Sequence, residues 1–208
     1  VYGNAFSPDS KFFGFTNLIF SYVKILSIPR KKIIYSFKCD GRYVKFSPNG
    51  RFFAYSTNKN NIIVRTLKNC NVVYKLMGHT GEINSIDFSS NNKYIATGSS
   101  DKTIRIWSLK SGKLFHILNK NIYYNKGIII NDDRVKFSPD GKFIANVFHK
   151  DNNIYIWSVK TGKVYAILKG HTEFIWSLAF SPDSRFLVSG SHDETTGIWS
   201  IKKRKLIN

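Results

Sequence analysis

The amino-acid sequence predicts an all-β fold built from five repeated units of about 40 residues. One short phrase recurs with little change, as FSPDS, FSPNG, FSSNN, FSPDG and FSPDS, starting at positions 6, 46, 88, 137 and 180. Apolar and polar residues alternate on both sides of each phrase, which is the pattern of half-buried strands. No stretch of the chain shows a convincing helical periodicity.

Each unit repeats the same order of elements. A first strand ends at the phenylalanine of the phrase, and the residues after it favour a turn because proline presets φ and glycine or asparagine tolerates positive φ. A second strand follows, then a third that often ends in Trp-Ser, then a short fourth such as KLFHIL or KVYAIL. Four short antiparallel strands per repeated unit are typical of a β-propeller, in which each unit is a blade. The predicted units lie within a single domain, 1–208, and are approximately 1–38, 39–77, 78–119, 120–169 and 170–208.

Two units are preserved best, GHTGEINSIDFSSNNKYIATGSSDKTIRIWS at 78–108 and GHTEFIWSLAFSPDSRFLVSGSHDETTGIWS at 170–200. They closely resemble the WD-repeat (WD40-like) family, with Trp-Ser in place of the name-giving Trp-Asp. The resemblance implies a buried, hydrogen-bonded tetrad of His, Ser or Thr, Asp and Trp, since a buried carboxylate and imidazole must be paired. The implied structural tetrads are His79, Thr97, Asp101 and Trp107 in unit three, and His171, Ser189, Asp193 and Trp199 in unit five.

The other units depart from the tetrad pattern. Unit four has Asn146 at the hydroxyl position and lacks the Gly-His pair. Unit two has Tyr55 and Arg65 at the hydroxyl and Trp positions, and unit one has Leu26 near the Trp position. We therefore expect the blades of units one and two to rely on apolar burial alone.

The length of the chain indicates that it is part of a larger propeller. Propellers have about four to eight blades, and the resemblance implies seven as the commonest number. The five units use all 208 residues, and Val1 already lies inside the first predicted strand. We expect a fragment of a propeller of about seven blades; a free-standing ring of five blades is the alternative.

The net charge of +19 is predicted to be uneven. The turns between strands one and two and between strands three and four emerge on one rim, and most of the excess basic residues fall there. This candidate basic rim includes two clusters, Arg30, Lys31 and Lys32, and Lys202, Lys203, Arg204 and Lys205. Such a rim can bind RNA or an acidic partner through contacts that weaken with salt. The alternative is a set of solvated turn lysines in a chain with a biased genome composition, and the sequence lacks a basic stretch interleaved with aromatics.

The opposite face is predicted to be neutral and to bind partners. In WD-repeat proteins the face bearing the loops that lead into the first strands commonly docks peptides or domains. Phe174 and Trp176 of unit five match the polar Glu82 and Asn84 of unit three, which indicates exposed aromatic anchors. The alternative is that both aromatics pack under the neighbouring blade that is missing from this chain. The further candidates for partner binding are His192, Lys150, Tyr123 and Tyr124.

The motifs that the sequence lacks limit the classes of function that we expect. The histidines outside the tetrads lack metal-ligand spacing, and neither a phosphate-binding loop nor a nucleophile elbow is present. We expect no enzyme, cofactor, metal or small-molecule substrate. Two unpaired thiols suit a reducing compartment, and no apolar run is long enough for a membrane span. The sequence predicts an intracellular protein, cytoplasmic or nuclear, that acts as a non-catalytic scaffold for other proteins. The alternative is an RNA-associated propeller in ribosome assembly or RNA processing that uses the basic rim.

Overall fold

The computed structural model describes residues 3–17, 21–39, 42–119, 135–148 and 151–207. Its strands form five separate four-stranded antiparallel sheets, and within each sheet the strands lie in sequence order. The described residues contain no helix. The all-β prediction, with four strands in each blade, is therefore confirmed.

The strands divide among the blades as follows. Blade one contains β1 (Asn4–Phe6), β2 (Phe12–Asn17), β3 (Tyr22–Ser27) and β4 (Lys32–Lys38), and blade two contains β5 (Val44–Phe46), β6 (Phe52–Ser56), β7 (Ile62–Thr66) and β8 (Val72–Leu76). Blade three contains β9 (Ile83–Phe88), β10 (Tyr94–Ser99), β11 (Thr103–Ser108) and β12 (Leu114–Asn119). Blade four contains β13 (Val135–Phe137), β14 (Phe143–Val147), β15 (Ile154–Ser158) and β16 (Val164–Leu168), and blade five contains β17 (Ile175–Phe180), β18 (Phe186–Ser191), β19 (Thr196–Ser200) and β20 (Lys205–Leu206).

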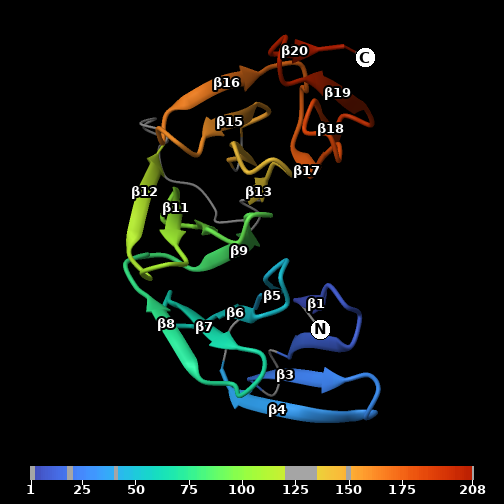
Figure 1. Ribbon diagram of the computed structural model, residues 1–208. Coiled ribbons are helices and arrows are strands. Elements are labelled where there is room, and N and C mark those ends of the chain that lie inside the picture. Colours follow the sequence, from blue (N-terminus) through green and yellow to red (C-terminus); the bar gives the residue numbers. More distant parts are fainter. Residues whose placement is uncertain (1–2, 18–20, 40–41, 120–134, 149–150, 208) are drawn as a thin grey trace.

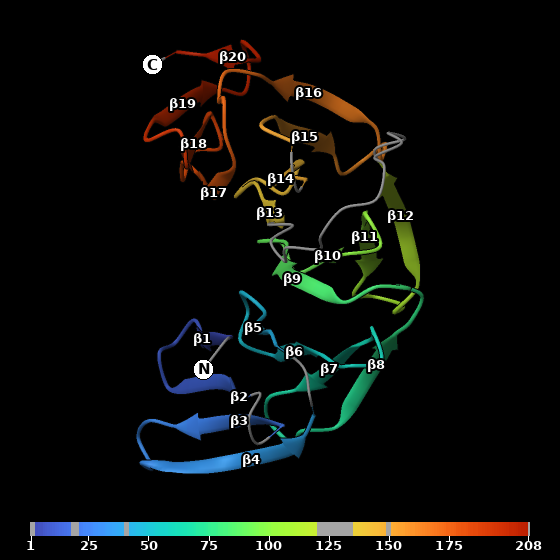
Figure 2. The ribbon, with the colours of Figure 1, turned by 180° about the vertical axis from the view of Figure 1, so that it is seen from behind.

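The blades follow one another around an open arc, with the two chain ends in the blades at its two extremities (Figure 1). The first strand of each blade lies on the inner side of the arc, and successive first strands contact one another from β1 to β17. The fourth strands β4, β8, β12 and β16 form the outer perimeter, which is also visible from behind (Figure 2). The turns and loops therefore emerge on the two faces of the arc.

The hydrophobic core lies between the blades. One buried cluster joins Ile104 and Ile106 of blade three to Trp157 of blade four, and the other clusters join blades in the same way. This arrangement follows from strand alternation, because the two faces of each sheet meet two different neighbours. The phenylalanine of the repeated phrase is buried in blades two to four, whereas Phe6 of blade one is 62% exposed, with no blade before it among the described residues.

The repeated phrase is a turn closed by its own side chains. In blade four the Ser138 hydroxyl donates to Asp140 Oδ1 at 2.6 Å and accepts the N–H of Phe143 at 2.9 Å. Asp140 Oδ1 also accepts the N–H of Lys142 at 3.0 Å. Because each of these bonds needs a serine followed two residues later by Asp or Asn, the phrase recurs wherever the first strand turns into the second.

The outer edges of the blades interlock at the third turn. The ring of Tyr74 covers Gly112 of the next blade, and His116 covers Gly162. A Cβ on Gly112 would lie 2.3 Å from Cδ1 of Tyr74, so this glycine is required by close approach as well as by its φ of 69°. The blade-one residue in register with Tyr74 is Tyr35.

Candidate partner-binding surface

A continuous hydrogen-bond network ties blade three together. His79 Nδ1 lies 2.7 Å from Asp101 Oδ2, and His79 Nε2 lies 2.7 Å from Thr97 Oγ1. The indole N–H of Trp107 donates to the same Thr97 oxygen at 2.9 Å. One proton arrangement satisfies every group: Nδ1–H donates to the carboxylate, Nε2 accepts the threonine hydroxyl, and the threonine oxygen accepts the indole N–H. The network joins the loop before β9 to β10 and β11.

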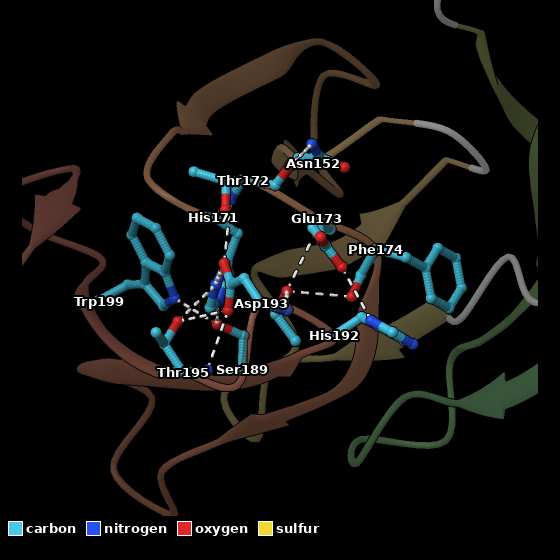
Figure 3. Close-up of polar contacts among 11 residues, drawn as sticks. Asn152, His171, Thr172, Glu173, Phe174, Ser189, His192, Asp193, Thr195 and Trp199 are labelled. Atoms are coloured by element: carbon cyan, nitrogen blue, oxygen red, sulfur yellow. Dashed lines mark hydrogen bonds and ion pairs between the residues drawn. The ribbon is translucent and has the colours of Figure 1, made fainter.

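Blade five repeats the network. His171 Nδ1 lies 2.8 Å from Asp193 Oδ2, and its Nε2 lies 2.7 Å from Ser189 Oγ, which accepts the Trp199 indole N–H at 2.7 Å. Figure 3 shows these side chains converging between the loop before β17 and the β18–β19 turn, with Thr195 beside the carboxylate. The same geometry arises in both blades because equivalent residues, with Ser189 in place of Thr97, stand at the same strand positions.

The two carboxylates are held ionised. Burial raises the pKa of Asp101, but hydrogen bonds from His79 and Thr103 outweigh it and bring the pKa well below the ordinary value of 3.8. For Asp193, desolvation is likewise outweighed by hydrogen bonds, first from the Thr195 hydroxyl and the Thr172 N–H. Each carboxylate is therefore occupied in fixing a turn.

Blade four keeps only half of the network. The Trp157 indole N–H donates to Asn146 Oδ1 at 2.7 Å, and Asp151 Oδ2 instead accepts the Tyr155 hydroxyl at 2.7 Å. The amide nitrogen of Asn146 has no hydrogen-bond partner among the described residues. The Trp and Asp positions are thus separately paired and no longer linked.

Blade two corrects the expectation of apolar burial alone. Arg65 Nε donates to the Tyr55 hydroxyl at 3.2 Å, and its Nη1 donates to the carbonyl of Cys70 at 2.7 Å. The guanidinium carbon lies 4.3 Å from the centre of the Phe37 ring, a cation–π contact with blade one. The expectation was wrong for this blade because the residues at the tetrad positions, though foreign to the family pattern, pair with each other.

An exposed cluster of aromatic side chains lies on blade five, where the start of β17 meets the β18–β19 turn. We call Phe174, Trp176 and His192 the aromatic patch. Trp176 is 46% exposed. Its ring packs edge to face against the Phe174 ring, with 4.9 Å between the two ring centroids and 86° between the ring planes. The His192 ring lies 5.8 Å from Trp176, and His192 Nδ1 pairs with Glu173 Oε2 at 2.8 Å. Figure 3 shows Glu173, Phe174 and His192 together, beside the loop that leads into β17.

A β-bulge sets the position of Trp176. The β17–β18 register shifts between Ile175 and Ser177, which leaves Trp176 outside the ladder, and such shifts re-aim a side chain. The same shift in blade three leaves out Asn84, which is buried, with its Oδ1 lacking a hydrogen-bond partner among the described residues. The two equivalent positions differ in exposure, since Trp176 is 46% exposed and Asn84 is buried.

The other predicted site residues lie either outside the described residues or at the two ends of the arc. Lys150, Tyr123 and Tyr124 lie outside the described residues. The cluster at 30–32 and the cluster at 202–205 are exposed where the third turns of blades one and five lead into β4 and β20, at opposite ends of the arc (Figure 1). The Arg204 guanidinium covers the Tyr165 ring at 4.2 Å. Sequence reasoning missed the Glu173–His192 pair, whose only signal was that Glu173 adjoins Phe174.

The described part of the chain contains neither a metal-ligand cluster nor a long apolar helix. No group of three or more His, Cys, Asp or Glu side chains lies close enough together to bind a metal ion. No helix there is long and apolar enough to cross a membrane.

The sequence of the chain is similar to those of known repeat proteins. The family model described as "WD domain, G-beta repeat" matches residues 70–108, 133–158 and 162–200. The human transducin beta-like protein 2 is 36% identical over 142 residues, which cover 63% of this chain and 31% of the relative. Eukaryotic translation initiation factor 3 subunit I of Pyricularia oryzae is 32% identical over 107 residues, or 51% of this chain and 29% of the relative. WD repeat-containing protein srw1 of Schizosaccharomyces pombe is 22% identical over 188 residues, 86% of this chain and 30% of the relative. The chain spans about a third of the length of these relatives.

Proposed function

The chain belongs to the WD-repeat family, and from this premise we propose that it is a non-catalytic scaffold in an intracellular multiprotein complex. WD-repeat proteins generally mediate protein–protein interactions. In this proposal residues 1–208 act as one propeller segment, and the aromatic patch of blade five contacts a peptide or domain of a partner protein.

The observation that carries the proposal is the exposed Trp176 ring held edge to face against Phe174 at 4.9 Å. Tryptophan is enriched among the residues that dominate binding energy at interfaces. A ring already fixed by a neighbour loses little conformational freedom on binding, so more of its contact energy contributes to affinity. The Glu173–His192 pair beside it supplies polar groups at the rim of the patch.

The non-catalytic part of the proposal rests on how the reactive side chains are used. His79 and His171 each have both ring nitrogens in hydrogen bonds within a buried network. A general base needs a free nitrogen within reach of a substrate proton. These histidines therefore support the fold and are not placed for proton transfer.

The test compares two exposed aromatics in affinity isolation from cells that make the protein. Trp176→Ala should remove the bound proteins, and Phe115→Ala should retain them, because Phe115 is similarly exposed at 41% but lies on β12, away from the patch. Both variants are also melted. A Trp176→Ala protein that loses several degrees in Tm would show that the ring belongs to the core, and equal retention of partners by both variants would overturn the proposal.

A second function is favoured by the exposed basic rim: association with RNA in ribosome assembly or RNA processing. The cluster Lys202, Lys203, Arg204 and Lys205 is solvent-exposed, and the similarity to a translation initiation factor subunit is compatible with an RNA setting. A fluorescent oligouridine should bind the purified protein at about 50 mM salt and much more weakly at about 200 mM.

The matched controls for RNA binding neutralise equal numbers of charges. Replacing the four residues of the cluster by glutamine should weaken binding strongly. Replacing Lys38, Lys59, Lys75 and Lys102, which lie elsewhere on the surface, should weaken it less. An absence of binding at low salt rejects the RNA function and leaves the scaffold proposal standing.

A further inference from the structure

A groove opens on the basic rim between blades one and two. It has a volume of about 840 Å³ and is formed by four turns, two from each blade. Four basic side chains line it, Lys11, Arg30, Lys32 and Lys68, together with a single carboxylate, Asp9. The groove is on the face opposite the aromatic patch, so it is a separate surface.

Asp9 does not neutralise the groove. Its Oδ1 accepts the Ser7 hydroxyl at 2.6 Å and the Lys11 N–H at 3.1 Å, and its Oδ2 lies 4.0 Å from Lys11 Nζ. The hydrogen bond from Ser7 is the largest of the effects that lower the pKa of this carboxyl. Asp9 is thus held within its own turn, and Arg30, Lys32 and Lys68 form no ion pair with any described residue.

The apolar part of the groove is aliphatic at its surface. Ile33 is 45% exposed at the start of β4 and lines the groove. Phe12, Ile34 and Tyr35 also line it, but they pack against the core cluster of blades one and two. The Tyr35 hydroxyl donates to the Lys68 carbonyl at 3.1 Å, and its ring stacks on Phe37 at 6.3 Å. The tyrosine is held in place by these two contacts, and the exposed apolar residues of the groove are Pro29 and Ile33.

The residue at one turn position explains why this joint is open. Tyr74 and His116 close the next two joints by covering Gly112 and Gly162. In blade two the corresponding turn residue is Cys70, which has a φ of 60° and carries a side chain. A ring cannot lie over Cys70 as Tyr74 lies over Gly112, where a Cβ would be 2.3 Å from the ring. Tyr35 reaches this turn through its hydroxyl instead.

We propose that this groove binds an acidic peptide segment of a partner protein, with an aliphatic side chain of the peptide seated on Ile33. Three unpaired cations complement a run of carboxylates and steer its approach. An aliphatic contact adds specificity that charge alone does not give. Single-stranded RNA is the less suitable occupant, because bases stack on exposed aromatic faces, whereas the exposed apolar residues of the groove are Pro29 and Ile33.

The probe is a fluorescent peptide of about twelve residues that repeats Glu-Glu-Leu, measured by anisotropy on the purified chain. The groove variant is Lys32→Glu with Lys68→Glu, and the matched control is Lys160→Glu with Lys163→Glu, which makes the same charge change in the corresponding turn of blade four. The groove variant should weaken binding by about tenfold or more, since reversing two exposed charges turns attraction into repulsion, and the control by much less.

Two further arms complete the test. A peptide with serine in place of every leucine should bind the wild-type chain more weakly, and Ile33→Ser should abolish the difference between the two peptides. Equal weakening by the groove and control variants would overturn the proposal in favour of diffuse charge. Tighter binding of an oligouridine of equal length, displaced by the peptide, would overturn it in favour of RNA. The aromatic patch is untouched by these variants, so Trp176-dependent partner binding succeeds or fails independently.

Discussion

The carboxylate of Asp87 in β9 accepts a hydrogen bond from the backbone N–H of Phe137 in β13, at 2.9 Å between Oδ2 and the nitrogen. Lys45 of β5 lies on the other side, with its Nζ 3.9 Å from Asp87 Oδ1. One side chain thus joins the inner strands of blades two, three and four. These strands are the ones that hold the arc together on its inner side, where the blades approach most closely.

Removing the acceptor should cost more than removing the charge. Burial raises the pKa of Asp87, against the effects of Lys45 and the Phe137 N–H, so the charge itself is not favoured there. Asp87→Ala leaves the Phe137 N–H unpaired and should lower the free energy of unfolding by about 1–3 kcal/mol. Asp87→Asn keeps an acceptor and should cost clearly less. Urea denaturation measures both, and an equal loss in the two variants would show that the hydrogen bond contributes little.

The buried network of blade three should be essential to its stability. His79→Ala leaves the Thr97 hydroxyl and the Asp101 carboxylate without their shared partner, which should lower the free energy of unfolding by about 1–3 kcal/mol. As a control, His192→Ala removes a histidine that is exposed to solvent, and it should change stability little. An unchanged melting curve for His79→Ala would contradict the structural role of the network.

The stability of the chain should fall in acid partly through Asp101. Its pKa is lowered in the folded protein from the ordinary 3.8, so its ionised form stabilises the fold above that value. This contribution is lost as the pH falls from about 5 towards 2 and the carboxylate takes up a proton. The unfolding free energy of Asp101→Asn should therefore be lower at neutral pH and flatter over this range. Parallel pH profiles for the two proteins would contradict the lowered pKa.

The close packing of blade two against blade three should depend on the absence of a side chain at Gly112. Gly112→Ala and Gly50→Ala both place a methyl group at positive φ, at a shared cost of about 1–2 kcal/mol. Gly50 faces open space, whereas a Cβ at Gly112 meets the Tyr74 ring. Gly112→Ala should therefore cost about 1–3 kcal/mol more. Equal denaturation midpoints would mean that the ring moves aside freely.

The architecture was readable from the sequence because strand alternation and turn chemistry are local. The phrase around Ser138 closes its own turn, so its recurrence marked every junction of a first and second strand. The resemblance of units three and five to the WD-repeat family, more than any local pattern, indicated where the His79 and His171 networks would form.

Contacts between blades were not readable, because they join residues that no local pattern relates. The contact of Arg65 with the Phe37 ring, the Asp87–Phe137 bond and the groove between blades one and two all depend on what a neighbouring blade presents. Trp176 illustrates the point: its blade-three counterpart Asn84 is polar yet buried, so residue type alone did not determine exposure.

The scaffold proposal is tested most directly by photo-crosslinking from the aromatic patch. A photoreactive benzoylphenylalanine is placed at position 176, and in a second protein at position 115, in cells that make the chain. Irradiation should produce a discrete protein adduct from position 176, because the ring lies in the proposed contact surface, and not from position 115. No adduct from position 176, or the same adduct from both positions, would contradict partner binding at the aromatic patch.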